Sequence, residues 1–222
     1  MSLVCYDLAK IVIDDEIVER AFAEAIATLG IVAGTEAYTR SMVRFDRGRG
    51  RSPADILREL FEGDETRAQA ACLAFDQSFS AAAERFGVAA SPEVLAPFGK
   101  VSAAGRRVCS LTTLSRGAAG PLIGQLHLHG PADLVLCADD APRGFPWPDL
   151  VLTAMLRLGA GDVREVAVVS ATEAGLLAGH RAGAGMVVGV TRNRKRLPAM
   201  RKAGATHILD DIAALPDLLA TP

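Results

Sequence analysis

The sequence predicts an α/β fold in which a parallel sheet carries an all-helical insertion after its first strand. Three observations lead to this prediction. An apolar segment, residues 3–6, ends in Asp7 close to the start of the chain. Residues 15–92 then show helical spacing of apolar side chains, with no convincing strand among them. From Arg106 onward, apolar strand candidates alternate with helical segments, a pattern typical of a parallel sheet that helices cover on both faces.

Length and composition limit the class of protein. The 222 residues are 50% hydrophobic, so the chain can bury a full core as one domain or as one domain with an insertion. A net charge of -2 does not indicate a nucleic-acid or membrane-surface binder. No apolar run approaches the about 18 residues that a membrane-spanning helix needs. The four cysteines, of which Cys72 is one, show no paired spacing. The other three lie inside apolar strand candidates, which favours small core residues in a reducing cytoplasm: Cys5, Cys109 and Cys137.

The helical block begins after Asp15. Apolar residues recur at helical spacing from Ile17 to Leu29, and Gly30 supplies a stop. Further helices are expected at residues 34–45, 52–62 and 65–86. A helical block of this length between two strands predicts a small separate domain of residues 15–92. Residues 1–14 and 93–222 would form the core, and the segment from Pro92 to Pro97 would be the return linker.

Polar residues follow several of the predicted strands. After the first strand, the strand candidates are Val108–Leu111, Leu134–Cys137, Val166–Val169, Met186–Val190 and His207–Leu209. Thr112, Ser170, Thr191 and Asp210 come directly after four of them. Because ligands bind at the carboxyl ends of parallel strands, these residues and Asp7 predict a site along one edge of the sheet. On its own segment, Asp7 is equally well explained as the cap of a turn or helix.

Four segments together resemble one known family. The segment Asp7-Leu-Ala-Lys-Ile-Val-Ile-Asp14 is similar to Asp-x-Ala-Gly-Thr-Thr-x-Asp, and Leu111-Thr-Thr-Leu-Ser-Arg116 to Leu-Thr-Thr-Gly-Phe-x-Arg. The segment from Arg143 to Pro148 resembles Arg-Pro-x-Pro-Trp-Met, and residues 202–209 are also typical. These are motifs of the phosphonatase-like branch of the haloacid dehalogenase (HAD) superfamily, which carries a helical cap of the C1 type. The resemblance covers nearly the whole chain and implies a Rossmann-like core.

The resemblance implies roles for particular residues. Asp7 would be the nucleophile that forms an aspartyl-phosphate, Thr112 would hydrogen-bond the phosphoryl oxygens, and Arg143 would neutralise the developing charge. Thr113 would contact the substrate, and backbone amides just after Asp7 would complete the cradle. The implied cofactor is a magnesium ion that bridges the nucleophile and the phosphate.

The chain departs from the family at the metal ligands. The family's fourth motif is Gly-Asp-Thr-x-x-Asp, whose acids hold the metal, but here Ala171 and Gly175 stand where the two carboxylates belong. Asp7 and Glu173 are the remaining candidate ligands. Two unit charges about 4 Å apart are worth roughly 4 kcal/mol at an effective dielectric constant near 20. The loss of both acids should therefore weaken a magnesium site by several orders of magnitude.

Other departures lie around the nucleophile. Lys10 and Ile11 replace a Gly-Thr pair, and Ala9 replaces the acid that protonates the leaving group in ordinary family phosphatases. Phosphonoacetaldehyde hydrolases also have Ala at that position, but they use a cap lysine that forms an imine with the substrate. Pro53 stands where that lysine would fall. Hydrolysis of phosphonoacetaldehyde by that route is therefore not expected.

Two further groups of side chains suggest binding. Arg44, Arg47, Arg49 and Arg51 form a basic run in the helical block that could clamp an anionic substrate, although a solvated loop is the favoured explanation. His127 and His129 alternate in a way that could bring two imidazoles to zinc. Because zinc needs at least three ligands, we interpret the histidine pair as structural or incidental.

Three functions follow from these observations. The first is a HAD-like hydrolase that uses Asp7 on a small phosphorylated or similarly activated substrate, with impaired or repurposed magnesium-dependent phosphatase chemistry. The second is a catalytically inactive binding protein, a pseudoenzyme. The third is a metal-independent hydrolase like the family's dehalogenases, whose Val-Ser-Ser-Asn is similar to residues 168–172. The expected partner is a small anionic substrate, with a homodimer as an option; neither nucleic acid nor membrane is expected, and the expected location is the cytoplasm.

Overall fold

The computed structural model describes residues 1–9, 11, 13, 15–86, 92–125 and 132–220. Its centre is a six-stranded parallel sheet with the strand order β3-β2-β1-β4-β5-β6. The strands are β1 (Leu3–Asp7), β2 (Arg107–Leu111), β3 (Leu134–Leu136), β4 (Val166–Ser170), β5 (Met186–Val190) and β6 (His207–Leu209). The predicted α/β fold class is thereby confirmed.

The strand order reverses at β1. The chain runs from β1 outward to β2 and β3 on one side, then returns to place β4 directly on the other side of β1. In open parallel sheets such a reversal point leaves a crevice at the carboxyl ends of the strands, where ligands bind. Asp7, the last residue of β1, therefore lies at the position in the sheet that the topology favours for a site.

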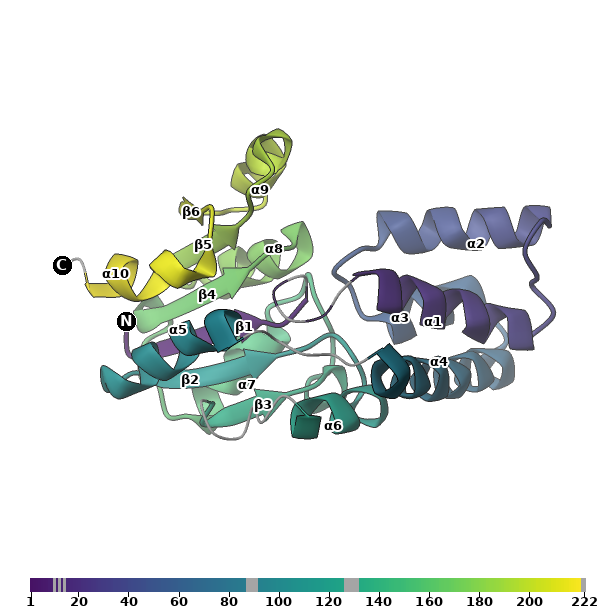
Figure 1. Ribbon diagram of the computed structural model, residues 1–222, viewed down its shortest axis with the longest axis horizontal. Coiled ribbons are helices and arrows are strands. Elements are labelled where there is room, and N and C mark those ends of the chain that lie inside the picture. The colour runs from purple at the N-terminus through teal and green to yellow at the C-terminus, as the bar shows by residue number, and fades with distance from the viewer. Residues whose placement is uncertain (10, 12, 14, 87–91, 126–131, 221–222) are drawn as a thin grey trace.

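Helices cover both faces of the sheet, as Figure 1 shows. On one face lie α5 (Pro92–Ala103) and α10 (Leu215–Ala220), and on the other α7 (Asp149–Arg157) and α8 (Glu173–Ala182). Alternation along β1 supplies both cores: Val4 and Tyr6 belong to one hydrophobic cluster, and Leu3 and Cys5 to the other. Two further short helices, α6 (Arg116–Gln125) and α9 (Leu197–Lys202), complete the sheet domain.

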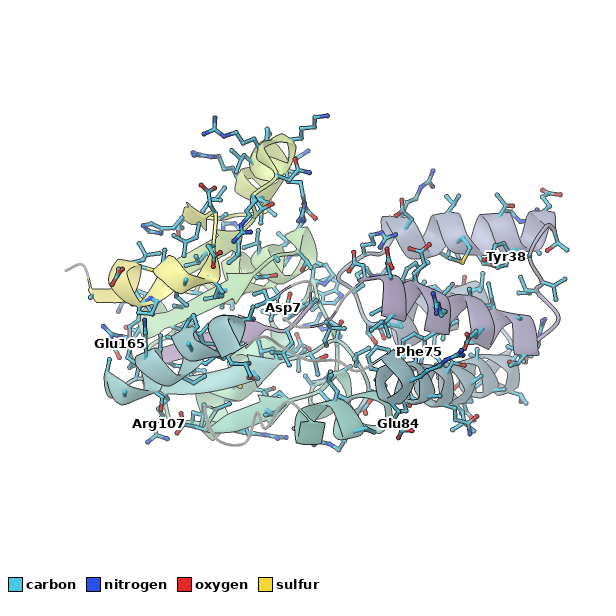
Figure 2. The ribbon with its side chains drawn as sticks, viewed as in Figure 1. Asp7, Tyr38, Phe75, Glu84, Arg107 and Glu165 are labelled. Atoms are coloured by element: carbon cyan, nitrogen blue, oxygen red, sulfur yellow. The ribbon has the colours of Figure 1, made fainter. Side chains whose placement is uncertain are left out.

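Four helices lie together beyond the end of the sheet that carries Asp7 (Figures 1 and 2). They are α1 (Asp15–Thr28), α2 (Glu36–Arg47), α3 (Pro53–Leu60) and α4 (Glu65–Phe86), and we call them the helical unit. Their shared core contains buried aromatic rings, among them Phe22, Phe45 and Phe79. The predicted domain boundaries at residues 15 and 92 remain a proposal that this arrangement supports.

One predicted element is wrong. The segment from Pro92 to Pro97 is not a linker but the first half of α5, with Pro97 inside the helix. Proline is tolerated in a first helical turn, which explains Pro92. A proline further in removes one backbone hydrogen bond, and burial of the adjacent Phe98 and of Val101 offsets that loss.

Other predicted boundaries hold to within about two residues. The helix at 65–86 and the strands at 186–190 and 207–209 have the predicted bounds. Two strands extend one residue further than predicted, so that Asp7 and Ser170 belong to β1 and β4. Cys5, Cys109 and Cys137 are buried free thiols. In the described part of the chain, no helix has the length and apolarity to cross a membrane.

Candidate functional site

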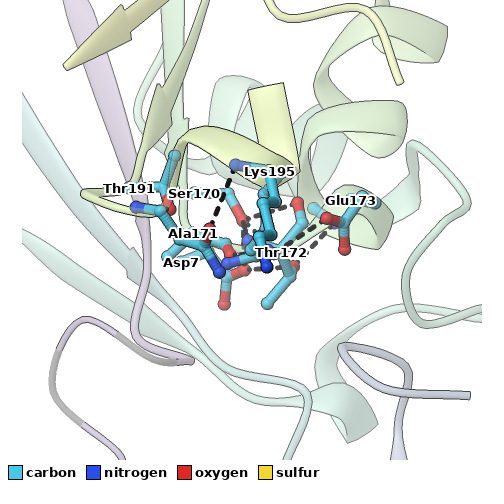
Figure 3. A network of polar contacts seen from close by, with 10 residues as sticks. Asp7, Ser170, Ala171, Thr172, Glu173, Thr191 and Lys195 are labelled. Atoms are coloured by element: carbon cyan, nitrogen blue, oxygen red, sulfur yellow. Dashed lines mark hydrogen bonds and ion pairs between the residues drawn. The ribbon is translucent and has the colours of Figure 1, made fainter. Parts of the chain in front are cut away.

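The carboxylate of Asp7 accepts three hydrogen bonds at the end of β1 (Figure 3). Its Oδ1 accepts from the backbone N–H of Ala9 at 3.0 Å. Its Oδ2 accepts from the hydroxyl of Ser170 at 2.6 Å and from that of Thr172 at 3.1 Å. Since β4 is hydrogen-bonded to β1, its last residue, Ser170, reaches the carboxylate directly. The Asp7 side chain is fully buried among these groups.

The two hydroxyls are themselves held by the start of α8. The Ser170 hydroxyl accepts from the backbone N–H of Thr172 at 2.9 Å. The Thr172 hydroxyl accepts from the backbone N–H of Gly175 at 3.1 Å, which makes Thr172 the N-cap of the helix. Each hydroxyl has one proton to donate. The Ser170 hydroxyl also lies 3.2 Å from the backbone oxygen and 3.1 Å from the hydroxyl of Thr172, but its contact with the Asp7 carboxylate, at 2.6 Å, is the shortest. The strand-to-helix turn therefore aims two donors at one carboxylate oxygen.

Burial changes the protonation of Asp7. The pKa of the carboxyl is raised from 3.8 to about 6, mainly by removal from water and to a smaller extent by the nearby negative charge of Asp15. Hydrogen bonds from Ser170, from the Ala9 amide and from Thr172 lower the pKa and partly offset the burial. The group therefore changes from neutral to ionised near pH 6, and the carboxylate predominates above neutrality.

The residues around Asp7 do not fit a magnesium ion. A Cβ atom at Gly175 would lie 2.4 Å from the Ser170 hydroxyl oxygen and 2.6 Å from Asp7 Oδ2, so this arrangement has no room for an acidic side chain there. Glu173 accepts a hydrogen bond from Arg196 Nη2 at 2.9 Å, and the same nitrogen donates to the backbone oxygen of Ala171 at 2.9 Å. Among the described residues, no three His, Cys, Asp or Glu side chains come together to hold a metal.

A small cavity lies between the helical unit and the end of the sheet. It has a volume of about 40 Å³, and its walls include Thr112 and Thr113 from the core together with Arg49, Arg51 and Phe45 from the helical unit. Ala9, whose amide binds Asp7, also lines it. Thr112 follows the strand residue Leu111, which is paired with Asp7 in the sheet. The structure thus places both predicted threonines in the wall of the same cavity as Ala9, the neighbour that binds the nucleophile candidate, while Asp7 itself is not among the described residues that line it.

The structure does not bring Arg143 into this cavity. Its guanidinium donates two hydrogen bonds to the carboxylate of Asp149, at 2.9 and 2.8 Å. It also lies over the ring of Trp147, with 4.5 Å between the guanidinium carbon and the ring centroid, while Arg181 lies at 4.9 Å from that centroid. The predicted role of Arg143 in charge neutralisation stays a prediction.

The four arginines of the predicted clamp separate into two pairs. Arg49 and Arg51 line the cavity, but Arg49 forms ion pairs with Asp15, Glu19 and Asp46, and Arg51 pairs with Glu59. Arg44 donates to the backbone oxygen of Glu59 at 2.8 Å, and both Arg44 and Arg47 lie outside the cavity. Their substrate-binding role also stays a prediction.

The sequence did not predict the hydrogen bonds that the hydroxyls of Ser170 and Thr172 donate to Asp7. It identifies Ser170 only as a polar residue at a strand end, and it gives Thr172 and Arg196 no role. The similarity of residues 168–172 to the dehalogenase motif was the available signal for the two hydroxyls. No local signal points from Arg196 to Ala171, because the two residues are far apart in the sequence. Lys10, Asp14, His127 and His129 lie outside the described residues.

No family model matches the chain. A phosphonoacetaldehyde hydrolase from Pseudomonas entomophila (strain L48) is 32% identical over 111 residues, which span 40% of this chain and 40% of that protein. The match thus covers well under half of the relative's length.

Solved structures match over the whole chain. A hydrolase from Pseudomonas syringae has a TM-score of 0.79 at 20% identity and covers 100% of this chain and 99% of its own. A haloacid dehalogenase-like hydrolase from Bacteroides fragilis has a TM-score of 0.72 at 18% identity, with 96% and 99% covered. The chain therefore has the fold of the haloacid dehalogenase superfamily hydrolases, with a phosphonoacetaldehyde hydrolase as a low-identity relative over part of its length.

Proposed function

We propose that the protein is a small-molecule hydrolase in which Asp7 is the nucleophile and the substrate carries a phosphoryl or similarly activated group. The observation that carries the proposal is the buried Asp7 carboxylate at the strand-order reversal, with Ser170, Thr172 and the Ala9 amide all donating to it. The fold and the names of the relatives agree with hydrolysis. In this proposal, the helical unit is a lid of the C1 cap type.

The chemistry has two steps. The ionised Asp7 attacks the electrophilic centre of the substrate, the bond to the leaving group breaks, and an ester or acyl phosphate forms on Asp7. A water molecule then attacks this intermediate, which releases the product and regenerates the carboxylate. The hydroxyls of Ser170 and Thr172 orient one carboxylate oxygen, so that the other, which Ala9 contacts, is presented for attack. Because Ala9 cannot protonate a leaving group, we expect substrates whose leaving group departs as a stable anion.

The proposed site works without a resident dication. The donors around Asp7 are neutral hydroxyls and an amide, and the space beside Gly175 has no room for a metal-binding acid. A doubly charged phosphoryl group placed about 4 Å from the carboxylate would then meet repulsion of roughly 4 kcal/mol per charge at an effective dielectric constant near 20. This repulsion favours electrophiles with little negative charge at the reacting centre.

A second candidate function follows from the same hydroxyls. The third hypothesis, a metal-independent hydrolase that attacks carbon as dehalogenases do, needs a positioned carboxylate and no dication. The hydrogen bonds from Ser170 and Thr172 to Asp7 position the carboxylate in this way. We therefore rank a carbon electrophile, such as a 2-haloacid, beside the phosphoryl substrate. A pseudoenzyme remains the alternative if neither is turned over.

The test combines turnover with isotope labelling. Wild-type protein is assayed with acetyl phosphate and with 2-chloropropionate, each in EDTA and in excess MgCl₂. Turnover of 2-chloropropionate is also run in H₂¹⁸O, and the peptide that contains Asp7 is examined by mass spectrometry for ¹⁸O in its carboxylate, because water that attacks the carbonyl carbon of an Asp7 ester leaves its oxygen there. With acetyl phosphate, water attacks phosphorus and labels the released phosphate instead, so the Asp7 acyl phosphate is trapped by borohydride reduction and detected in the same peptide. Turnover in EDTA with the matching mark on Asp7 supports the proposal. Asp7→Asn should abolish turnover and mark, while Glu165→Gln, an exposed carboxylate that precedes β4 at the end opposite Ser170, keeps them. Folded protein that turns over neither substrate, or turnover without a mark on Asp7, contradicts it.

A further inference from the structure

A second hollow lies next to the site and has a different character. It is a groove of about 600 Å³ between residues 46–51 of the helical unit and the helices α8 and α9 of the core. This volume is within the range of about 300–1,000 Å³ that is usual for small-molecule sites. Glu173 and Ala174, which directly follow Thr172 of the site, form part of its wall. We call it the basic groove.

The charges of the groove favour an anion. Its lining contains five cationic side chains against the two acids Asp46 and Glu173; the cations are Arg47, Arg49, Arg51, Arg196 and Lys202. Both acids are already engaged, Asp46 by Arg49 and Glu173 by Arg196. A cleft lined mainly by one sign of charge concentrates ligands of the opposite sign. The groove is therefore suited to a negatively charged group.

Two of these cations are available to a ligand. Within the described part of the chain, neither Arg47 nor Lys202 forms an ion pair with a carboxylate, and both are exposed. Arg47 ends α2 in the helical unit, and Lys202 ends α9 in the core. An anion held by both side chains would bridge the two parts of the molecule across the groove.

The rest of the lining is apolar. Leu177 and Ala174 from α8 and Ala199 and Ala203 from the region of α9 contribute hydrocarbon surface, and Pro146 contributes more. A site with an apolar floor and a cationic rim fits a ligand that has a short hydrocarbon or aromatic body and an anionic end.

The size of the inner cavity links the groove to the reaction. With a volume of about 40 Å³, the cavity beside Thr112 holds little more than the reacting group of a substrate. Arg49 and Arg51 line both the cavity and the groove, so the two spaces lie against the same loop. The remainder of a substrate must lie outside the cavity, and the groove is a neighbouring space large enough to hold it.

From this geometry we infer that the basic groove binds a second, distal anionic group of the substrate, between Arg47 and Lys202. The inference rests on the proposed function and deepens it. The substrate class is a small molecule with an activated group at one end, a short apolar spacer, and a carboxylate or phosphate at the other end.

The test measures binding separately from turnover. The probe is phenylphosphonate, an aromatic dianion without a leaving group. Its binding is measured by calorimetry and by the fluorescence of Trp147. Trp147 is the single tryptophan of the chain and follows Pro146 of the groove in the sequence. The double variant Arg47→Gln/Lys202→Gln should bind the probe at least about tenfold more weakly, because each lost contact is a charge-assisted hydrogen bond. The matched control Arg194→Gln/Arg201→Gln removes the same charge from exposed positions outside the groove lining and should change affinity less than about twofold.

Two further measurements separate the inference from the proposed function. Asp7→Asn should bind phenylphosphonate as wild type does; clearly tighter binding in that variant, from relief of repulsion by the Asp7 carboxylate, would place the probe beside Asp7 and overturn the inference. Equal weakening in both double variants would also overturn it. If the enzyme is active, the groove variant should raise KM for succinyl phosphate, which carries a distal carboxylate, but not for acetyl phosphate. If neither acyl phosphate nor 2-chloropropionate is turned over, the proposed function fails, while the binding data still decide the role of the groove.

Discussion

Replacement of Asp7 by Asn should stabilise the fold at neutral and alkaline pH. The carboxyl is fully buried, and its pKa in the folded protein is about 6 against an ordinary value of 3.8. Because the folded state holds the proton more tightly than the unfolded state, the stability that the neutral carboxyl provides is fully present below about pH 4. It is lost as the pH rises through about 6. The amide side chain of the Asp7→Asn variant is neutral at every pH and would avoid this loss.

The magnitude follows from the size of the pKa difference. A rise from 3.8 to about 6 corresponds to about 3 kcal/mol once Asp7 is fully ionised, at about 1.36 kcal/mol per pH unit. The Ser170 and Thr172 hydroxyls can rotate to accept from the new amide, so the hydrogen-bond network survives in part. The stability of Asp7→Asn relative to wild type should therefore grow by about 2–3 kcal/mol between pH 4 and pH 8.

The assay is chemical denaturation of both proteins at several values between pH 4 and pH 8. Glu165→Gln, which changes an exposed carboxylate at the end of β4 opposite Ser170, is the control and should show no comparable growth. A stability difference between Asp7→Asn and wild type that is constant over this range would refute the reasoning. It would mean that Asp7 is not held in a desolvated site. A gain in stability on replacement of the proposed nucleophile would agree with the usual trade-off between stability and the desolvation of an active site.

Three other predictions follow from contacts elsewhere. Ser170→Ala removes the 2.6 Å hydrogen bond that lowers the pKa of Asp7. The pKa of Asp7 should therefore rise above about 6 by roughly one pH unit. A carboxyl ¹³C NMR titration measures this pKa, and an unchanged midpoint contradicts the prediction. Gly185→Ala would place a Cβ 1.9 Å from the backbone oxygen of Arg164. It should lower the free energy of unfolding, measured with denaturant, by about 3 kcal/mol or more. In the control Gly99→Ala, inside α5, the new Cβ meets nothing within 4 Å, and this change should be neutral or stabilising. Tyr6→Phe removes a buried hydroxyl that has no hydrogen-bond partner among the described residues. It should raise stability by about 1 kcal/mol, and a fall in melting temperature would contradict the prediction.

The sequence by itself determined most of the elements. The helix Glu65–Phe86 and the strands Met186–Val190 and His207–Leu209 follow from apolar periodicity and from short apolar runs, which are local properties. Where a local signal competed with packing, it failed. The prolines from Pro92 to Pro97 indicated a linker, but burial of Phe98 and Val101 against the sheet favours a helix.

The position of the site could also be predicted, because parallel strands end along one edge of the sheet. Asp7, Thr112 and Ser170 were expected there from chain order alone, and the structure brings them together. What no local rule could supply was the partner of each charged or polar group. Arg143 forms an ion pair with Asp149, and Arg49 forms ion pairs with Asp15 and Glu19. These side chains meet only when the chain is folded.

Only the tertiary structure decided the chemistry around Asp7. Its two hydroxyl donors come from a strand and a turn that lie more than 160 residues further along the chain. Its pKa of about 6 arises from burial beneath those groups, and the small cavity and the basic groove exist only where the helical unit meets the sheet. Desolvation and close contact are properties of the packed molecule, because they depend on which distant atoms exclude water from a side chain.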